Sequence, residues 1–211
     1  MQKFQLTHRD ATKISEHVAY RITQCLKFLL NLFYGDKYAK RAVILETIAA
    51  VPGMVAGMFN HLKALRRMKD DQGWIKELLD EAENERMHLM IFLNIANPSW
   101  IERLLVLIGQ AVFIVVYSTI YILSSKIAHR IVGYFEEEAC KSYTEYLERI
   151  DEGKVENLSA PQMAIDYYQL PSNAKLRDVI LKIREDEAKH RDRNHEFADC
   201  YQNKNLPEHQ Y

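Results

Sequence analysis

Glycine and proline are scarce in this chain, with 7 glycines and 5 prolines among 211 residues. Their low counts, together with little strand-like alternation of apolar and polar residues, favour helices over strands. The formal net charge at pH 7 is −1, so bulk electrostatics give no indication of a nucleic-acid partner. We therefore expect an all-α protein in which residues 1–211 form a single domain with a sizeable core.

Cysteine is also rare. Cys25, Cys140 and Cys200 are far apart, odd in number and in no C-x-x-C motif, which is typical of free thiols in a reducing compartment. We expect no secretory signal, because the first residues, MQKFQLTHRDATK, contain no apolar stretch. Too little sequence precedes the first expected helix for a typical transit peptide.

Apolar periodicity predicts a series of long helices joined by short connections. Ser15 is expected to cap the first, which ends near Tyr34. Further helices are expected over residues 40–68, 74–96, 104–123, 128–150 and, starting at 172 or 173, to about 200. Pro52 should kink the second helix, and the connecting sequence 151–171 contains a short segment, MAIDYYQL.

One apolar run is unusually long. Residues 104–123 read LLVLIGQAVFIVVYSTIYIL without a charge, which is long enough for a transmembrane helix. A single pass would have to leave the remaining helices in a compatible arrangement, so we expect a helix with one side in the bundle and the other in a membrane leaflet. The apolar stripe of the first helix fits either core packing or a membrane interface.

Two short sequence segments contain candidate metal ligands: ENERMHLM contains Glu85 and His88, and REDEAKHRDR contains Glu187 and His190. Residues three apart on an α-helix lie on one face, about one turn apart. Each word therefore predicts a carboxylate and an imidazole that point in the same direction.

Two further glutamates are expected to point inward. Glu46 has small apolar neighbours at helical spacing, where a carboxylate is costly to bury unless its charge is compensated. A surface glutamate is the alternative there. In the run FEEEACKSYTEY, Glu136 has the more apolar neighbours and Glu138 the more polar ones, so we interpret Glu136 as inward-facing. Glu81 and Glu83 are expected to be solvated.

One Glu from each of two helices and Glu-x-x-His from each of two others is the donor set with which ferritin-like four-helix bundles bind two metal ions. Oxygen ligands with few imidazoles and no thiolate suit iron or manganese rather than structural zinc. Dioxygen activation at a di-iron centre is the chemistry to expect. Spacing alone leaves ferroxidase, hydroxylase and oxidase open. The basic run Lys63, Arg66, Arg67 and Lys69 is interpreted as a solvated helix end or a lipid-headgroup contact.

Four words resemble the signature segments of the alternative oxidase family: LETIAAVPGMVAGM, EAENERMHLM, HRIVGYFEEEACKSYT and REDEAKHRDRNH. The similarity runs in register from about Thr7 to Asp199. It implies a cyanide-insensitive ubiquinol oxidase that does not pump protons. It also implies a ferritin-like di-iron four-helix bundle, bound to one membrane leaflet as a homodimer. Two further helices, here the first one and residues 104–123, would contact the membrane.

The resemblance also assigns residues. The iron ligands would be Glu46, Glu85, His88, Glu136, Glu187 and His190. Tyr143 matches a tyrosine proposed to take part in electron and proton transfer, and Asn84 and Asp186 match positions that orient ligands. The quinol-pocket positions would be Arg41, Leu45, Glu138, Ala139 and Ser142. Lys27 and Asn31 stand where some relatives have arginine and aspartate.

The implied reaction takes electrons from ubiquinol and reduces O2 to water at two iron ions, with Arg41 and Glu138 orienting the quinol oxygen. A quinone-biosynthesis hydroxylase, a plastid-type quinol oxidase and an iron-storage bundle are the alternatives. Because the first helix begins close to residue 1, we expect the cytoplasmic face of a bacterial inner membrane. The alternative is the matrix face of the mitochondrial inner membrane.

Overall fold

The computed structural model describes residues 6–35 and 37–203, and within them it contains helices and no strand. The helices are α1 (Ile14–Tyr34), α2 (Tyr38–Arg67), α3 (Trp74–Ala96), α4 (Trp100–Leu123), α5 (Ser125–Asp151), α6 (Gln162–Tyr168) and α7 (Leu176–Asn203). This confirms the all-α expectation, and the short segment before the last helix forms α6.

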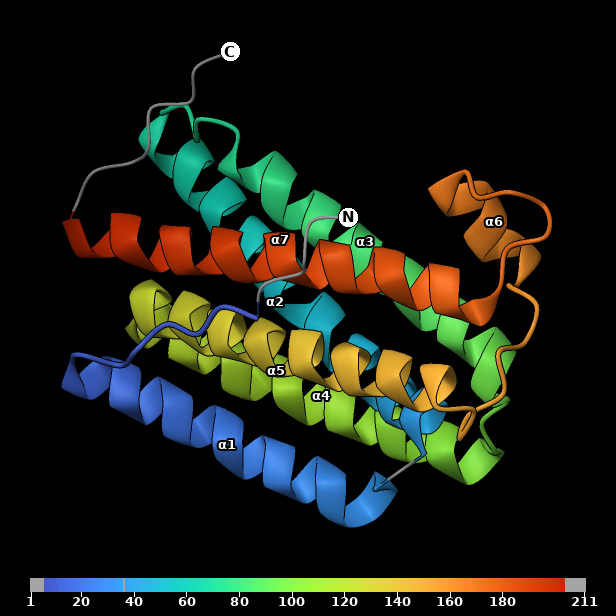
Figure 1. The fold of residues 1–211 in the computed structure, drawn as a ribbon. Helices are drawn as coiled ribbons and strands as arrows, with labels where there is room; N and C mark the ends of the chain where they lie inside the picture. Colours follow the sequence, from blue (N-terminus) through green and yellow to red (C-terminus); the bar gives the residue numbers. More distant parts are fainter. Residues whose placement is uncertain (1–5, 36, 204–211) are drawn as a thin grey trace.

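Four long helices form the bundle. The helix α2 packs along α3, and α5 packs along α7, while α1 lies against α5 and α4 lies against both α2 and α5 (Figure 1). The pairs α2–α3 and α5–α7 come from different halves of the chain. The arrangement is that of a ferritin-like bundle with two added helices, as the sequence predicts.

Two apolar cores fill the bundle at successive levels. The first contains Ala42 of α2 and Phe92 of α3, together with residues of α5 and α7. The second contains Val51 of α2 and Leu78 of α3, with Val132 of α5 and residues of α4 and α7. On α2, α3 and α5 the glutamates of interest lie between these two levels in sequence. The fold therefore holds its acidic residues between two dry layers.

Several helix starts differ from the expectation: α4 begins at Trp100 and α5 at Ser125, four and three residues earlier than expected. The helix α1 begins at Ile14, so Ser15 lies in its first turn and does not cap it; the Glu16 carboxylate instead accepts hydrogen bonds from the Thr12 and Lys13 N–H groups at 3.0 and 3.3 Å. The helix α7 begins at Leu176, later than expected. The preceding residues are held in an antiparallel bridge between Ser159 and Lys175, and the Lys175 N–H donates to Asp178 at 2.9 Å.

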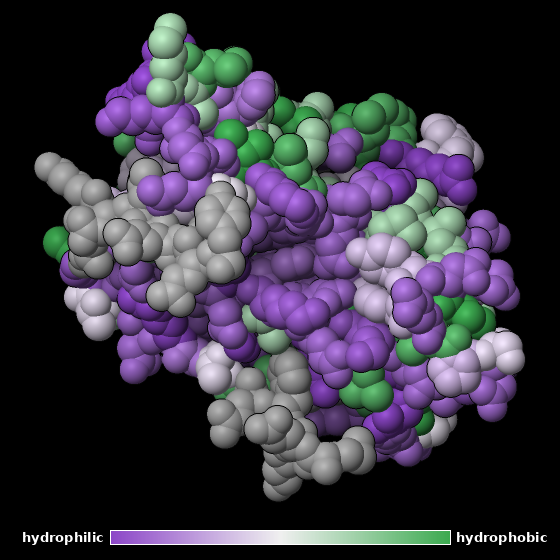
Figure 2. Space-filling model, turned by 90° about the horizontal axis from the view of Figure 1, so that it is seen from above, coloured by the Kyte–Doolittle hydropathy of each residue, from purple (hydrophilic) through white to green (hydrophobic). Residues whose placement is uncertain are grey.

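The helix α4 covers the bundle with two tyrosines and leaves most of its apolar surface outside. Only Tyr117 and Tyr121 are buried within it. Its exposed large apolar side chains are Trp100, Ile101, Leu104, Leu105, Leu107, Ile108, Val112, Ile114, Val115, Val116, Ile122 and Leu123. In Figure 1, α1 and α4 lie toward the bottom, whereas the face seen from above in Figure 2 is mostly hydrophilic. The helices α2 and α4 are both long and apolar enough to cross a membrane, but α2 is largely inside the bundle.

Candidate metal centre

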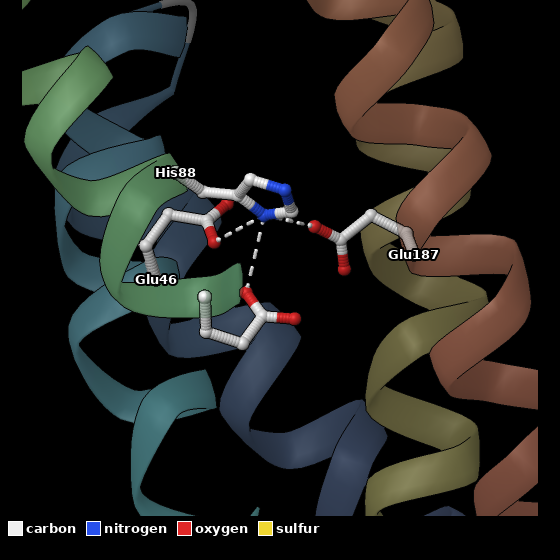
Figure 3. Close-up of side chains that lie close together, drawn as sticks. Glu46, His88 and Glu187 are labelled. Atoms are coloured by element: carbon white, nitrogen blue, oxygen red, sulfur yellow. Dashed lines mark ion pairs between the residues drawn. The ribbon is translucent and has the colours of Figure 1, made fainter. Parts of the chain in front are cut away.

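Four of the predicted ligands meet in one buried cluster. Glu46 of α2, Glu85 and His88 of α3, and Glu187 of α7 each offer a ligand atom within 4.8 Å of the others. The Nδ1 of His88 lies 3.3 Å from Glu46 Oε2, 3.3 Å from Glu85 Oε2 and 3.2 Å from Glu187 Oε1 (Figure 3). All four side chains are at most 2% exposed.

The other two predicted ligands adjoin this cluster. The His190 Nδ1 lies 2.5 Å from Glu85 Oε1, and the buried Glu136 carboxyl interacts with that of Glu187. The structure thus brings all six side chains together from α2, α3, α5 and α7. Their i, i+3 pairs on α3 and α7 face the bundle axis, as helical geometry requires.

The donor atoms fit metal ions because hydrogen bonds leave them unsatisfied. Seven nitrogen and oxygen atoms of these residues are buried without a hydrogen-bond partner: Glu46 Oε2, both carboxyl oxygens of Glu85, both ring nitrogens of His88, Glu187 Oε1 and His190 Nδ1. Buried polar atoms without partners are costly, and all of these except His88 Nε2 face the cluster. Metal coordination is the interaction that would satisfy carboxylate oxygens and imidazole nitrogens together.

The pKa shifts of three cluster carboxylates also favour a bound cation. Burial, followed by repulsion between neighbouring carboxylates, raises the pKa of Glu85 to about 8, and it raises the pKa of Glu136 well above its ordinary value. The pKa of Glu187 is raised to about 7 by the same two causes. Burial and crowding therefore disfavour the charged forms of these three carboxylates, whereas burial of Glu46 is outweighed by its contacts with His88, which lower its pKa. A bound cation would remove the penalty at Glu85, Glu136 and Glu187.

Beyond the cluster, a polar chain supports the outer nitrogen of His88. Its Nε2 lies 3.6 Å from Asp186 Oδ2. The same carboxylate accepts hydrogen bonds from Asn84 at 3.3 Å, Tyr168 at 3.0 Å and Lys189 at 2.7 Å. Burial opposes ionisation of Asp186, but the contacts to His88 and Lys189 outweigh it and lower its pKa. Asn84 and Asp186 are thus placed where they could fix the His88 ring.

An apolar cavity of about 480 Å³ reaches the cluster from the side of α1 and α4. Glu46, Glu136 and Glu187 form part of its wall. All five predicted quinol positions also line it: Arg41, Leu45, Glu138, Ala139 and Ser142. Leu105 and Phe113 of α4 complete its apolar side. A long apolar molecule could therefore reach the acidic cluster without crossing the bundle core.

The polar groups of this cavity form two sets. Arg41 donates to Asn31 Oδ1 at 3.0 Å and to Ser142 Oγ at 2.7 Å. Glu138 pairs with Lys27 at 2.5 Å and Lys141 at 2.8 Å. Burial would raise the pKa of Glu138, but these lysines and Gln24 outweigh it and lower the pKa. The neutral side chain of Asn31 thus accepts a hydrogen bond from Arg41, and Lys27 forms an ion pair with Glu138.

A sequence comparison decides the family. The model of the family described as alternative oxidase matches residues 1–199 of the chain.

The chain belongs to the alternative oxidase family.

Curated relatives agree with this assignment. "Ubiquinol oxidase 2, mitochondrial" of Glycine max is 53% identical over 202 residues, which cover 95% of this chain and 61% of the relative. The Nicotiana tabacum protein of the same name is 53% identical over 194 residues, with coverages of 92% and 65%. "Ubiquinol oxidase, mitochondrial" of Batrachochytrium dendrobatidis is 53% identical over 192 residues, with coverages of 91% and 61%. The chain thus spans less than two thirds of these relatives' length, and their names give no support to the expected bacterial location.

One buried residue of this alternative oxidase family member was predicted wrongly. Glu81 was expected to be solvated, but it is 7% exposed and accepts hydrogen bonds from Asn194 Nδ2 at 2.9 and 3.0 Å. Burial, its largest influence, raises its pKa to about 7. Asn194 also donates to the His190 carbonyl at 3.0 Å and accepts from His129 Nδ1 at 2.9 Å. Glu81 lies four residues before Glu85, and that spacing was the signal for a shared face.

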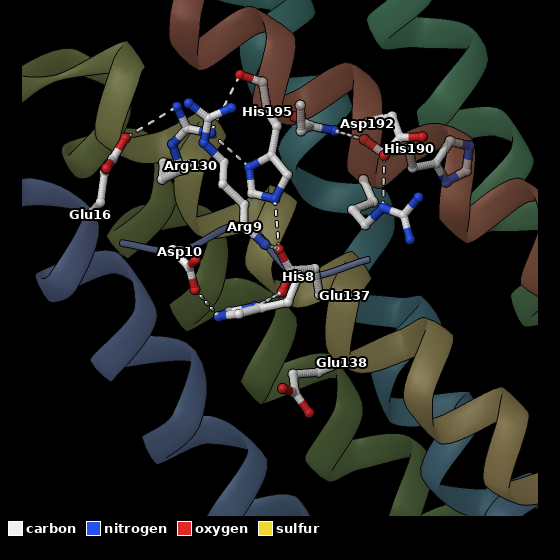
Figure 4. A network of polar contacts seen from close by, with 12 residues as sticks. His8, Arg9, Asp10, Glu16, Arg130, Glu137, Glu138, His190, Asp192 and His195 are labelled. Carbon is white, nitrogen blue, oxygen red and sulfur yellow. Dashed lines mark hydrogen bonds and ion pairs between the residues drawn. The ribbon is translucent and has the colours of Figure 1, made fainter. Parts of the chain in front are cut away.

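A second polar network, not anticipated from the sequence, lies beside Glu136. Glu137 accepts from His195 Nε2 at 3.0 Å and contacts His8 Nδ1 at 2.5 Å (Figure 4). Arg130 donates to His195 Nδ1 at 2.8 Å, so His195 must carry its proton on Nε2. Arg9 adds a bidentate pair to Asp199 at 2.8 and 2.9 Å. The network fastens the segment before α1 onto α5 and α7. His195 therefore lies outside the cluster of proposed ligands, as expected.

Proposed function

We propose that this chain is a ubiquinol oxidase that reduces O2 to water at a di-iron centre and pumps no protons. The observation that carries the proposal is the shared wall between two parts of the site. One apolar cavity is lined both by Arg41 and Glu138 and by the cluster residues Glu46, Glu136 and Glu187. A quinol in that cavity would therefore lie next to the acidic cluster. The names of the relatives support ubiquinol as its substrate.

The six predicted ligands would hold two iron ions. Four carboxylates carry four negative charges when ionised, which balances two divalent ions, and two imidazoles complete the set. Iron bound there would supply the electron-transfer and dioxygen chemistry that no amino-acid side chain provides. The residues contribute a fixed, dry and charge-balanced site.

Arg41, Ser142 and Glu138 are proposed to orient the quinol. The guanidinium of Arg41, fixed by Asn31 and Ser142, presents N–H donors to a quinol oxygen. Against the effect of burial, the neighbouring lysines keep Glu138 ionised by lowering its pKa, so its carboxylate can accept a hydrogen bond from the quinol hydroxyl. Leu45 and Ala139 provide apolar wall.

Tyr143 is proposed to assist at the cluster. Its hydroxyl donates a hydrogen bond to Glu46, one of the proposed ligands, and its side chain is 2% exposed. It can therefore hold or pass a hydrogen between that carboxylate and its surroundings without contact with bulk water. Tyr143 would then take part in the reaction more directly than any other residue that is not a proposed ligand.

We further propose that α1 and α4 rest in one leaflet of the mitochondrial inner membrane, facing the matrix, with the protein as a homodimer and residues 1–211 as one domain. Support for membrane contact comes from α4, whose window of highest hydropathy is only 11% buried. A segment with this much exposed apolar surface is unusual for a water-soluble helix. The mitochondrial assignment follows the names of the relatives.

The alternative functions account for fewer of these observations. An iron-storage bundle would have no use for the exposed apolar face of α4 or for a cavity lined by Arg41 and Glu138. A quinone-biosynthesis hydroxylase or a plastid-type quinol oxidase would share the ligands, but the relatives are named ubiquinol oxidases.

Oxygen uptake with ubiquinol in the presence of cyanide tests the proposal. Iron-loaded protein in lipid vesicles should consume one O2 for every two quinols and continue when cyanide is present. Protein stripped of metal should be inactive and should recover when ferrous iron is restored. Absence of sustained quinol-dependent uptake in the iron-loaded protein would contradict the oxidase assignment.

A further inference from the structure

Polar side chains bridge α3 and α7, the two helices that carry the Glu-x-x-His pairs. The bundle packs as α2 along α3 and α5 along α7, so α3 and α7 belong to different pairs. One bridge between them joins Glu77 to Arg193, where both side chains are partly exposed. Another joins Glu81 to Asn194 in the interior. This buried bridge adjoins the acidic cluster, and the proposed oxidase reaction assigns it no task.

The Glu81–Asn194 bridge has a fixed geometry. Glu81 is 7% exposed and Asn194 is 1% exposed. The Asn194 Nδ2 donates to Glu81 Oε1 and Oε2 at 2.9 and 3.0 Å, and to the His190 carbonyl at 3.0 Å. The Asn194 Oδ1 accepts from His129 Nδ1 at 2.9 Å. Both ends of this amide therefore have partners, and these partners determine which way it points.

The bridge lies one helical turn from a contact between two proposed ligands. Glu81 precedes Glu85 by four residues on α3, and Asn194 follows His190 by four residues on α7. Residues four apart share a helix face and are about 6 Å apart along the axis. The Glu85 carboxylate and His190 Nδ1 meet at 2.5 Å. Two contacts between α3 and α7 thus lie on successive turns, and each constrains the other.

Stability alone does not account for a polar pair at this place. A buried carboxylate that is held by one neutral amide is costly. Apolar side chains of similar volume often stabilise a core as well as a buried polar pair does. Hydrogen bonds differ from apolar contacts because they are directional, so a satisfied polar pair selects one spacing of the two helices. The Glu81–Asn194 bridge therefore contributes precision to the separation of α3 and α7.

We propose that Glu81 and Asn194 are positioning residues for the metal centre: their hydrogen bonds set the separation of α3 and α7 at Glu85 and His190, and through it the affinity of the site for iron. The inference rests on the proposed di-iron function and makes neither residue a ligand. Glu81 lies outside the group of four clustered ligand residues. Neither residue lines the quinol cavity, so the bridge acts on the metal site without contact with the quinol.

Exchanging the lengths of the two side chains tests this spacing without a change of charge. Glu81→Asp shortens one arm of the bridge by a methylene, and Asn194→Gln lengthens the other. Each single variant should bind ferrous iron at least about tenfold more weakly, as is usual when groups that orient metal ligands are changed. The double variant Glu81→Asp/Asn194→Gln restores the total reach and should return to within about threefold of the unchanged protein. Competition with a coloured ferrous chelator, without oxygen, measures these affinities.

Glu77→Asp is the matched control. It shortens the Glu77–Arg193 bridge between the same two helices by the same methylene, one turn further from Glu85 than Glu81 is. Because that pair is partly exposed, iron affinity should stay within about twofold of the unchanged protein. An equal loss in Glu77→Asp would show that iron affinity responds to any bridge between α3 and α7, and would overturn the role assigned to Glu81.

Two further measurements separate positioning from folding. The visible spectrum of cobalt(II) bound in place of iron reports the arrangement of its ligands; it should change in each single variant and revert in the double variant. With ubiquinol and O2, kcat should fall in the single variants while KM stays within about twofold.

Iron affinity that is unchanged in the single variants, or that the double variant fails to recover, would overturn the positioning role and leave the proposed function standing. Failure of the unchanged protein to bind iron would contradict the proposed function, and the positioning role with it.

Discussion

Tyr143 donates a hydrogen bond from its phenol to Oε1 of Glu46 in the buried centre of the bundle. Its ring stacks on Phe92 with centroids 5.8 Å apart. Burial and then the nearby Glu46 charge raise the pKa of Tyr143 well above its ordinary value, so the hydroxyl keeps its proton. One side chain thus joins the apolar core to a proposed ligand.

Tyr143→Phe separates these two contributions. The ring and its contact with Phe92 remain, so the variant should fold with a free energy of unfolding within about 1 kcal/mol of the unchanged protein and should keep its iron. Quinol-dependent oxygen uptake should fall by ~10²-fold, the range expected for loss of a positioned proton-transfer group. Tyr146→Phe is the control, because Tyr146 is buried on the same helix and stacks on Tyr38 instead. Full turnover in Tyr143→Phe would exclude a role in the reaction.

Two neighbouring glutamates should differ in what they bind. Glu136→Ala removes a proposed ligand and should lower the iron content per chain, because the remaining carboxylates no longer balance two ions. Glu138→Ala removes a cavity carboxylate and should keep iron while quinol turnover is lost. Iron analysis and oxygen uptake on the same preparations measure both, with the exposed Glu83→Ala as a control. Loss of iron in Glu138→Ala, or its retention in Glu136→Ala, would reverse the assignment.

Ser142→Ala tests the orientation of Arg41. The variant removes the 2.7 Å hydrogen bond from Arg41 to Ser142 and leaves the bond to Asn31. We expect KM for ubiquinol to rise about threefold to tenfold, which corresponds to the usual contribution of one hydrogen bond. Iron content should not change. Ser142→Thr, which keeps the hydroxyl, should restore most of the affinity, and a KM unaffected by either change would argue against this role.

Local spacing predicted much of the centre because helical geometry is regular. The helix period alone predicts that Glu85 and His88 share a face, and likewise Glu187 and His190. The structure places both pairs beside Glu46 and Glu136. Apolar runs predicted the helices for the same reason. The roles assigned to individual residues stay predictions.

Contacts between distant segments were not predictable in this way. The Glu81 carboxylate is buried because Asn194, on another helix, supplies both of its hydrogen bonds. The start of α1 depends on Glu16, which reaches back to Thr12, and not on the expected Ser15. In both cases side-chain partners, rather than propensity, decide the outcome.

The stability contributed by Glu16 should depend on pH. Burial would raise its pKa, but hydrogen bonds from Thr12 and Lys13 and the charge of Arg130 lower it to about 2 from 4.5. A depressed pKa stabilises the fold above the unfolded value of 4.5, and this contribution is lost as the pH falls toward about 2. Glu16→Gln should therefore lower the free energy of unfolding by on the order of 1–2 kcal/mol at pH 7 and by about half of that or less at pH 3. Urea unfolding at both pH values measures this, and an equal difference at both would contradict the mechanism.

Gly53→Ala should push α2 away from α3 at their closest approach. A Cβ at position 53 would lie 2.4 Å from the Leu78 carbonyl oxygen and 3.1 Å from the Ala82 Cβ, so backbone must move to accept it. We expect a loss of about 1–3 kcal/mol in the free energy of unfolding, measured with urea. Gly109→Ala on α4 is the matched control, because its Cβ would meet nothing within 4 Å. Helix propensity alone should make that variant neutral or more stable by up to about 1 kcal/mol. Glu46 and Glu85 lie on these two helices, so iron affinity should fall in Gly53→Ala and not in Gly109→Ala. Equal changes in stability and iron affinity in the two variants would show that helix propensity, rather than close packing, determines the outcome.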